Sequence, residues 1–243
     1  MNLIVQNLHV AGQDSGKGPA VLFLHGWGTD HKSLLSLTPI FGSCRVIAPD
    51  LPGFGDTQAP PVAWSVSEYA VFVRELLDKL NIEKINVVIG HSFGGRIAIE
   101  LLGNGLIAAD KMVLLASHGL PEPKNTRSNT LNFLAKAGKV LPASWRERAG
   151  SRFRSEDYRA TNGVMRQVFQ KVITQDGSKS ASQITIPTLL IYGQQDTTTP
   201  PAMGQQFNQL IKGSQLEVIA QAGHYVYLDQ PEQVNRLIKE FTS

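Results

Sequence analysis

Gly90-His91-Ser92-Phe93-Gly94-Gly95 is the stretch that decides the fold of this 243-residue chain. An apolar, β-branched run at residues 85–89 precedes it, and an amphipathic segment at residues 93–102 follows it. A strand, a sharp turn and a helix form the context in which a G-x-S-x-G motif exposes a serine as a nucleophile. Glycines flank the serine because larger side chains would collide across such a turn. The stretch therefore predicts that Ser92 performs covalent acyl chemistry, the alternative being a plain Gly/Ser-rich loop.

Apolar runs alternate with helix-like segments along the rest of the chain. This alternation is typical of an α/β fold with a mostly parallel central sheet and helices on both faces. Ser65 or Ser67 is placed to cap the first long helix. The predicted strands are residues 3–9, 20–24, 45–49, 85–89, 112–116, 188–192 and 216–219, and the predicted helices include residues 66–80, 93–102, 202–211 and 232–241.

The alternation breaks between residues 118 and 182. Pro121, Pro123, Asn125 and Pro142 punctuate this segment, while helical periodicity returns at residues 131–140 and 158–173. We interpret residues 118–182 as a helical cap inserted into a core made of residues 1–117 and 183–243. With 42% hydrophobic residues, the chain can bury one large core, so we expect a single domain.

A nucleophilic serine needs a base and an acid that orients the base. In enzymes built around such a turn, the acid and then the histidine follow the serine, each on a loop after a later strand. Asp196 follows the run at residues 188–192, and His224 follows the run at residues 216–219. Each residue alone is more often an ordinary loop residue. Their joint occurrence in the required order predicts that His224 shuttles the proton of Ser92 and that Asp196 orients His224.

Donors for a developing oxyanion are predicted next to the strand at residues 20–24. His25-Gly26-Trp27-Gly28 follows that strand directly, and glycines there allow the backbone to approach a substrate. The backbone amides of Trp27 and Phe93 are our candidates for the oxyanion hole, and a plain Gly-rich turn is the alternative. We expect His25 and His91 to support the backbone rather than to transfer protons.

Composition narrows the classes of protein further. The single cysteine, Cys44, excludes an intramolecular disulfide and fits a reducing compartment, and residues 1–10 lack the features of a signal peptide. We therefore expect a cytoplasmic protein with no membrane partner. The six histidines lack ligand-like spacing, so no metal and no cofactor are expected. The modest net charge of +3 and 7% aromatic content argue against a nucleic-acid partner.

The chain resembles the α/β-hydrolase family. The resemblance rests on residues 25–28, on Asp50-Leu51-Pro52-Gly53-Phe54-Gly55, on residues 90–95, on Asp196 and on Gly223-His224. It implies that Ser92, His224 and Asp196 form the catalytic triad and that residues 118–182 cover the active site. Asp50 is expected to be structural. Because residue 92 carries a hydroxyl, members that need a carboxylate nucleophile, such as epoxide hydrolases and haloalkane dehalogenases, are disfavoured.

Serine members of this family hydrolyse several classes of substrate. We predict a carboxylesterase acting on small to medium acyl groups; the alternatives are a carbon–carbon bond hydrolase, a thioesterase or a non-catalytic ligand-binding protein. The shared core does not choose among them, because loops and cap carry specificity.

The predicted cap is strongly basic. Residues 118–180 hold twelve Lys or Arg against five Asp or Glu, whereas the remaining residues hold eleven against fifteen. Such a charge suits an anionic substrate or an acidic carrier protein, and an ordinary solvated cap is the alternative. The His-Gly-Trp-Gly turn and the basic cap together resemble the pimeloyl-carrier-protein methyl ester esterases. Much of the charge comes from Arg146, Arg148, Arg152, Arg154, Arg159 and Arg166.

Overall fold

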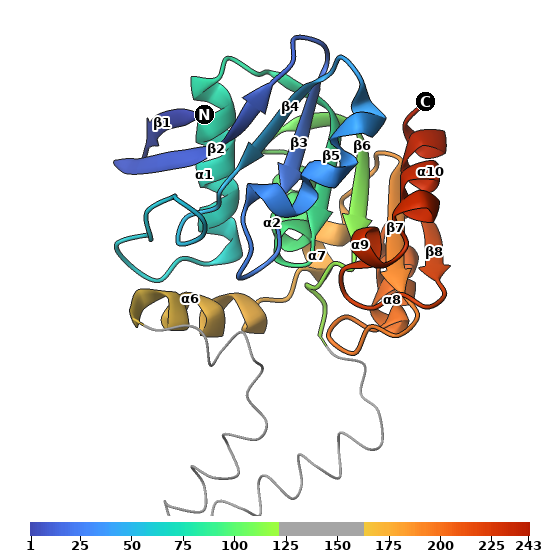
Figure 1. Ribbon diagram of the computed structural model, residues 1–243. Helices are drawn as coiled ribbons and strands as arrows, with labels where there is room; N and C mark the ends of the chain where they lie inside the picture. The colour runs from blue at the N-terminus through green and yellow to red at the C-terminus, as the bar shows by residue number, and fades with distance from the viewer. Residues whose placement is uncertain (122–162) are drawn as a thin grey trace, which may run out of the picture.

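The computed structural model describes residues 1–121 and 163–243, and an eight-stranded sheet forms its centre (Figure 1). The strands lie in the order β1-β2-β4-β3-β5-β6-β7-β8. β2 pairs antiparallel with β1 and β4, and all remaining neighbours are parallel. The predicted mostly parallel sheet is thus confirmed. Its strands are β1 (Asn2–Val5), β2 (Leu8–Ser15), β3 (Ala20–Leu24), β4 (Arg45–Pro49), β5 (Lys84–His91), β6 (Ala108–Leu115), β7 (Thr188–Gly193) and β8 (Gln215–Ile219).

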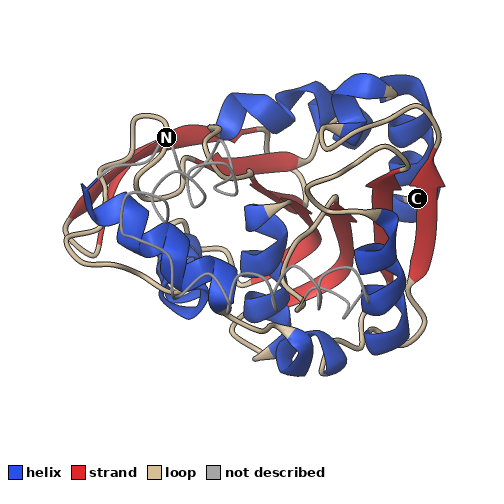
Figure 2. Cartoon of the chain, turned by 90° about the horizontal axis from the view of Figure 1, so that it is seen from below, coloured by secondary structure: helices blue, strands red, loops and turns tan. Residues whose placement is uncertain are grey.

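Helices cover both faces of this sheet, as the view from below in Figure 2 shows. On one face, α1 (Val66–Lys79), α2 (Phe93–Gly103), α7 (Ser178–Ser182) and α8 (Pro201–Leu210) contribute to the larger apolar core. On the other face, the 3-10 helix η1 (His31–Phe41), α9 (Val226–Asp229) and α10 (Pro231–Thr242) contribute to a second core. The helix α6 (Gly163–Thr174) lies across the edge at which the parallel strands end (Figure 1).

The strands contribute side chains to both cores because successive side chains of a strand point to opposite faces of the sheet. In β3, Leu22 and Leu24 enter the larger core, while Val21 and Phe23 enter the second. All four are buried, which explains why the strand reads as one continuous apolar run instead of an alternating pattern.

The prediction of a single strand at residues 3–9 is wrong. The structure turns at Gln6 and Asn7, whose φ angles are 49° and 62°, and divides this segment between β1 and β2. A tight hairpin turn needs positive φ at both central residues, and Asn tolerates that region better than most residues. The turn was missed because neither central residue is glycine.

The first long helix begins where its cap was predicted. The Ser65 hydroxyl accepts a hydrogen bond from the amide of Glu68, and the Glu68 carboxylate accepts one from the amide of Ser65. This reciprocal capping box satisfies amides that the first turn leaves unpaired.

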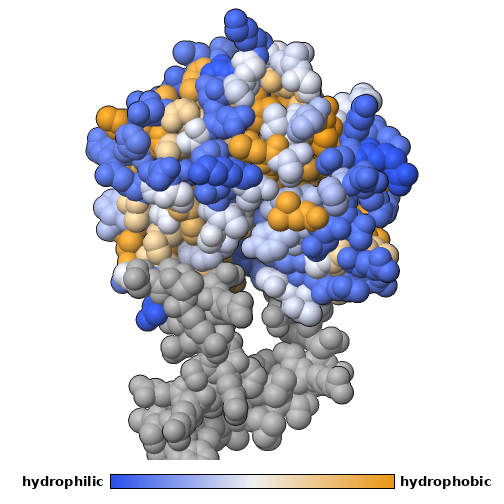
Figure 3. Space-filling view, in the orientation of Figure 1, coloured by the Kyte–Doolittle hydropathy of each residue, from blue (hydrophilic) through white to orange (hydrophobic). Residues whose placement is uncertain are grey.

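Most of the predicted cap, residues 122–162, lies outside the described residues, as does the helix predicted at residues 131–140. Residues 163–182 are described and include α6 and α7. Hydrophilic side chains dominate the face shown in Figure 3, with hydrophobic ones interspersed. Within residues 1–121 and 163–243, no helix combines the length and apolar character needed to cross a bilayer.

Candidate active site

Ser92 lies in a strained turn between β5 and α2. Its φ is 49° and its ψ is −107°, an unfavourable region for a residue with a side chain. A Cβ on Gly94 would stand 2.0 Å from the carbonyl oxygen of Leu24, and one on Gly90 would stand 2.7 Å from the Cα of Gly95. Both glycines are therefore required by the close approach of the backbone, as the motif predicts.

His91 links this turn to the loop that carries His224. Its Nε2 lies 3.1 Å from the carbonyl oxygen of His224, and the two rings are 4.9 Å apart between centroids. A carbonyl only accepts, so Nε2 carries the proton. Burial, followed by the nearby His224, lowers the pKa of His91 to about 3, which keeps the ring neutral. His91 thus holds the backbone of His224 close to Ser92, because Ser92 is the residue that follows His91 in the sequence.

His224 and Asp196 form a direct hydrogen bond. The Nδ1 of His224 lies 2.8 Å from Oδ2 of Asp196, and the carboxylate is almost completely buried. These residues stand on the loops that follow β8 and β7, neighbours in the sheet. A carboxylate that accepts from Nδ1–H leaves Nε2 as the basic nitrogen of a neutral imidazole.

The Asp196 carboxylate receives further hydrogen bonds from the turn that follows it. Oδ1 accepts from the amides of Thr198 and Thr199 at 2.7 and 2.9 Å, and Oδ2 accepts from the Thr199 hydroxyl at 2.6 Å. Burial opposes ionisation here. The hydrogen bonds from His224 and Thr199 nevertheless hold the pKa of Asp196 below its ordinary value, so this group is a carboxylate at neutral pH.

The candidate oxyanion donors lie on either side of the serine turn. A Cβ on Gly26 would stand 3.6 Å from the Cβ of Ser92, which brings the turn after β3 against Ser92. Phe93 is the first residue of α2, so its amide has no partner inside the helix. For the amide of Trp27, no acceptor exists among the described residues. Both amides are thus free of protein acceptors in this part of the chain.

Aromatic side chains surround Trp27 near this turn. Its ring centroid lies 4.8 Å from that of Phe54, 5.3 Å from that of Phe93 and 5.0 Å from that of Phe169. Phe169 belongs to α6, so the described part of the predicted cap packs against the candidate oxyanion loop. An apolar surface of this kind lowers the local dielectric and strengthens hydrogen bonds to a developing charge.

His25 has a structural environment. Its Nε2 accepts from the amide of Leu51 at 2.9 Å, and its Nδ1 lies 2.8 Å from the carbonyl oxygen of Gly26. Burial lowers its pKa to about 4, so the ring stays neutral and joins the loops after β3 and β4. With both ring nitrogens engaged by the backbone, His25 has no nitrogen left for proton transfer.

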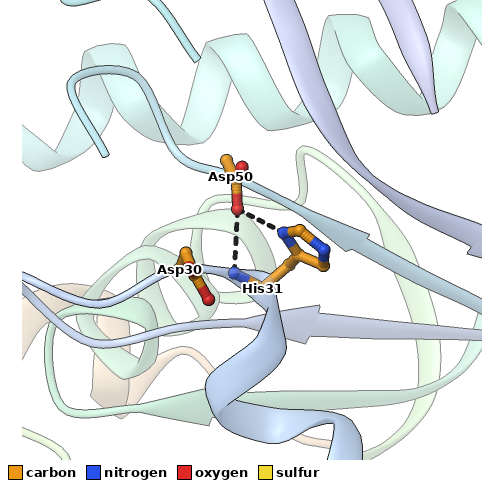
Figure 4. Close-up of side chains that lie close together, drawn as sticks. All are labelled: Asp30, His31 and Asp50. Atoms are coloured by element: carbon orange, nitrogen blue, oxygen red, sulfur yellow. Dashed lines mark hydrogen bonds and ion pairs between the residues drawn. The ribbon is translucent and has the colours of Figure 1, made fainter. Parts of the chain in front are cut away.

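Asp30, His31 and Asp50 form the one group of possible metal ligands within residues 1–121 and 163–243 (Figure 4). Oδ1 of Asp50 accepts from the amide and from Nδ1 of His31, at 2.8 and 2.6 Å. Oδ1 of Asp30 caps η1 through the amide of Lys32. The Nδ1 of His31 is therefore protonated and the group is a hydrogen-bonded corner, which agrees with the structural role expected for Asp50.

The loops that carry Ser92, Trp27, Asp196 and His224 all lie at the carboxyl edge of the parallel strands, on the side where α6 lies (Figure 1). Among the described residues, Asp196 and His224 are joined by a hydrogen bond, whereas no hydrogen bond joins the side chains of Ser92 and His224. Sequence reasoning missed Thr199, which completes the hydrogen bonds to Asp196. The run of threonines at residues 197–199 directly after an aspartate was a usable signal, because such residues commonly close turns onto a carboxylate. Of the twelve basic residues of the predicted cap, Arg166, Lys171 and Lys179 lie within the described residues.

Comparison with known proteins supports a common fold. A family model described as the alpha/beta hydrolase family matches residues 21–237. A 2-hydroxy-6-oxo-2,4-heptadienoate hydrolase of Pseudomonas putida is 26% identical over 263 residues, which cover 98% of this chain and 92% of the relative. An esterase from Exiguobacterium antarcticum superposes with a TM-score of 0.75 at 22% identity, over 100% of this chain and 99% of that one. A meta-cleavage product hydrolase from Pseudomonas fluorescens superposes with a TM-score of 0.75 at 24% identity, over 99% and 96%.

Proposed function

We propose that this chain, which belongs to the alpha/beta hydrolase family, hydrolyses carboxylic esters through an acyl-enzyme on Ser92. The family membership confirms the resemblance drawn from the motifs. The observation that carries the proposal is the hydrogen bond between His224 and a buried, ionised Asp196, anchored by His91 beside the strained Ser92 turn.

In this mechanism, the hydroxyl oxygen of Ser92 attacks the carbonyl carbon of the ester while Nε2 of His224 takes its proton. The amides of Trp27 and Phe93 donate to the oxyanion of the tetrahedral intermediate. The carbon–oxygen bond to the alcohol then breaks, and His224 returns the proton to the leaving alcohol. The same imidazole then takes a proton from water as the water oxygen attacks the acyl carbon, and it returns that proton to the Ser92 oxygen as the bond between the acyl group and Ser92 breaks and the acid leaves. Asp196 stabilises the imidazolium in both halves of the reaction.

Small to medium acyl groups suit the surface beside Ser92. The rings of Trp27, Phe54, Phe93 and Phe169 supply apolar contact next to the candidate oxyanion amides. An anionic substrate or an acidic carrier protein at the basic cap, and a cytoplasmic location, remain predictions from the sequence.

The test uses a fluorophosphonate label and p-nitrophenyl esters of increasing chain length. We expect the label on Ser92 and turnover of the short esters, and Ser92→Ala should abolish labelling and lower kcat by about 10⁴-fold or more. Ser182→Ala, which removes an exposed hydroxyl in α7, is the matched control and should keep full activity. Unchanged near-ultraviolet circular dichroism would show that both variants are folded.

Ester turnover that persists in Ser92→Ala would contradict the proposal. A wild-type protein that is not labelled and hydrolyses none of the esters would contradict it as well.

Hydrolysis of a carbon–carbon bond is the second candidate, and the 26% identity to the Pseudomonas putida hydrolase favours it. The same serine, base and oxyanion donors would serve this reaction. A 2-hydroxy-6-oxodienoate tested beside p-nitrophenyl acetate separates the two candidates. A kcat/KM for the dienoate more than about 100-fold above that for the ester would favour the carbon–carbon reaction, since that difference corresponds to about 3 kcal/mol in transition-state stabilisation.

A further inference from the structure

Arg96 and His118 form a buried pair beside the proposed nucleophile. Arg96 lies in α2, four residues after Ser92, and only 6% of it is exposed. Its Nη2 lies 2.6 Å from Nδ1 of His118. A guanidinium group has only donors, so Nδ1 of His118 must accept. The ring proton of His118 is therefore on Nε2.

A second donor fixes the same arrangement. The amide of Gly119 lies 2.8 Å from Nδ1 of His118, which requires the backbone to fold back onto the preceding side chain. The φ of Gly119 is +144°, a conformation that favours glycine, and its carbonyl accepts from the amide of Gly177 at 2.8 Å. Burial, followed by the charge of Arg96, lowers the pKa of His118 to about 4. The imidazole is thus neutral at physiological pH.

Arg96 is itself held by the end of α6. Its Nη1 donates to the carbonyl oxygens of Val172 and Gln175, at 2.6 and 3.2 Å. The side chain of Gln175 in turn accepts from the amide of Val66 at the start of α1. Within the described segments, no carboxylate pairs with Arg96, so no ion pair there offsets its positive charge next to His118.

His118 lies at the proposed active site. It lies in the loop after β6, and its own backbone amide donates to the carbonyl oxygen of Ser92 at 3.5 Å. Within residues 1–121 and 163–243, nothing accepts a hydrogen bond from its Nε2–H, and this nitrogen is not sealed from solvent.

We propose that His118 is a substrate-binding residue whose Nε2–H donates to an oxygen on the acyl part of the substrate, and that Arg96 is the positioning residue that fixes this tautomer. The class of substrate is an ester whose acyl chain carries a keto or carboxylate oxygen, because the charge of Arg96 behind the ring favours a partially or fully negative acceptor. This inference rests on the proposed ester hydrolysis.

The test compares p-nitrophenyl pentanoate with p-nitrophenyl 4-oxopentanoate and with the mono-p-nitrophenyl ester of glutaric acid. We expect the wild-type protein to have higher kcat/KM for the two oxygen-bearing esters. His118→Phe removes the donor and should lower that preference about 10-fold, mainly by raising KM for those esters. His118→Gln keeps an N–H at the end of the side chain and should restore most of the preference.

Two further measurements separate a specific role from a structural one. His9→Phe is the matched control, since His9 is exposed on β2 and pairs with Asn2, and it should leave the preference unchanged. Nitrogen-15 spectra of the histidine rings should show Nε2 protonated and Nδ1 unprotonated at residue 118. Arg96→Met should change that spectrum to a mixture of tautomers while the other histidine signals remain.

The inference is overturned if the wild-type protein hydrolyses all three esters without preference, or if His118→Phe keeps the preference. Protonation of Nδ1 in the wild-type spectrum overturns it equally. Failure of the proposed function gives a different result, because no ester would then be hydrolysed and Ser92 would not be labelled.

Discussion

Asp196 shows how individual residues support the proposed chemistry. A buried carboxylate is costly unless hydrogen bonds replace its hydration. Here the amides of Thr198 and Thr199, the Thr199 hydroxyl and His224 all donate to it. With its hydrogen bonds satisfied, the carboxylate stays charged and keeps His224 in one tautomer.

Replacement of Thr199 by valine tests this arrangement at the scale of one hydroxyl group. The substitution keeps the shape of the side chain but removes the hydrogen bond to Oδ2 of Asp196. A charge-assisted hydrogen bond contributes about 1.5–3 kcal/mol, so we expect kcat on a p-nitrophenyl ester to fall about 10-fold. Steady-state kinetics measure this effect.

Thr198→Val is the control for that experiment, because the exposed Thr198 contributes only its backbone amide to Asp196. It should retain the wild-type kcat. Equal losses in both variants would mean that the Thr199 hydroxyl has no special role.

At the scale of elements, the turn between β5 and α2 depends on how closely α2 packs against β3. The first turn of α2 approaches the end of β3 so closely that Gly94 lies against the carbonyl oxygens of Leu24 and His25. Gly95 similarly leaves room for the hydroxyl of Ser117 in the loop after β6. The helix can therefore present Ser92 only if these positions lack side chains.

Gly94→Ala should consequently destabilise the fold. Its methyl group would stand 2.0 Å from a backbone carbonyl oxygen, which cannot move without displacing β3. We expect the free energy of unfolding, measured by urea titration, to fall by about 3 kcal/mol.

Gly223→Ala is a matched substitution at a neighbouring loop, where the new methyl group would meet its nearest atom, Oδ2 of Asp229, at 3.5 Å. It should change the free energy of unfolding by less than about 1 kcal/mol. A stable, fully folded Gly94→Ala protein would contradict the packing argument.

For the whole molecule, burial of neutral histidines couples stability to pH. Burial lowers the pKa values of His25 and His118 to about 4 and that of His91 to about 3. In the unfolded chain these rings titrate near pH 6.5. The stability that depends on their neutrality is therefore complete above about pH 6.5 and is lost as the pH falls toward 4.

We expect the free energy of unfolding to decrease between pH 6.5 and 4.5 by up to about 4 kcal/mol per pH unit, since each ring contributes about 1.4 kcal/mol per unit. Urea titrations at several pH values measure this slope. The carboxylates with lowered pKa values lose their contribution only below about pH 4.5; they are Asp14, Asp50, Glu68, Asp176 and Asp196.

His25→Gln should reduce that slope by about one third, because the amide oxygen can still accept from Leu51 but does not titrate. His9→Gln, on the exposed side of β2, should leave it unchanged. A free energy of unfolding that is constant from pH 6.5 to 4.5 would contradict the coupling.

Much of the fold was predictable because its signals are local. Apolar runs, the Ser65 cap and the glycines of the serine turn act through neighbours in sequence. The parallel sheet and family membership followed from them, and both are confirmed. Local signals failed at the turn formed by Gln6 and Asn7, where the hairpin overrides a weak propensity.

By itself, the sequence determined most of the order of strands and helices along the chain and the glycine-flanked turn at Ser92, because backbone sterics and hydrophobic periodicity depend on adjacent residues. Only the tertiary structure decided which polar groups meet. His91 contacts the carbonyl of His224 across 133 positions, and Arg96 reaches Val172 across 76. Such partners depend on the order of strands in the sheet, so no spacing in the sequence encodes the contact of Arg96 with His118 or that of His224 with Asp196.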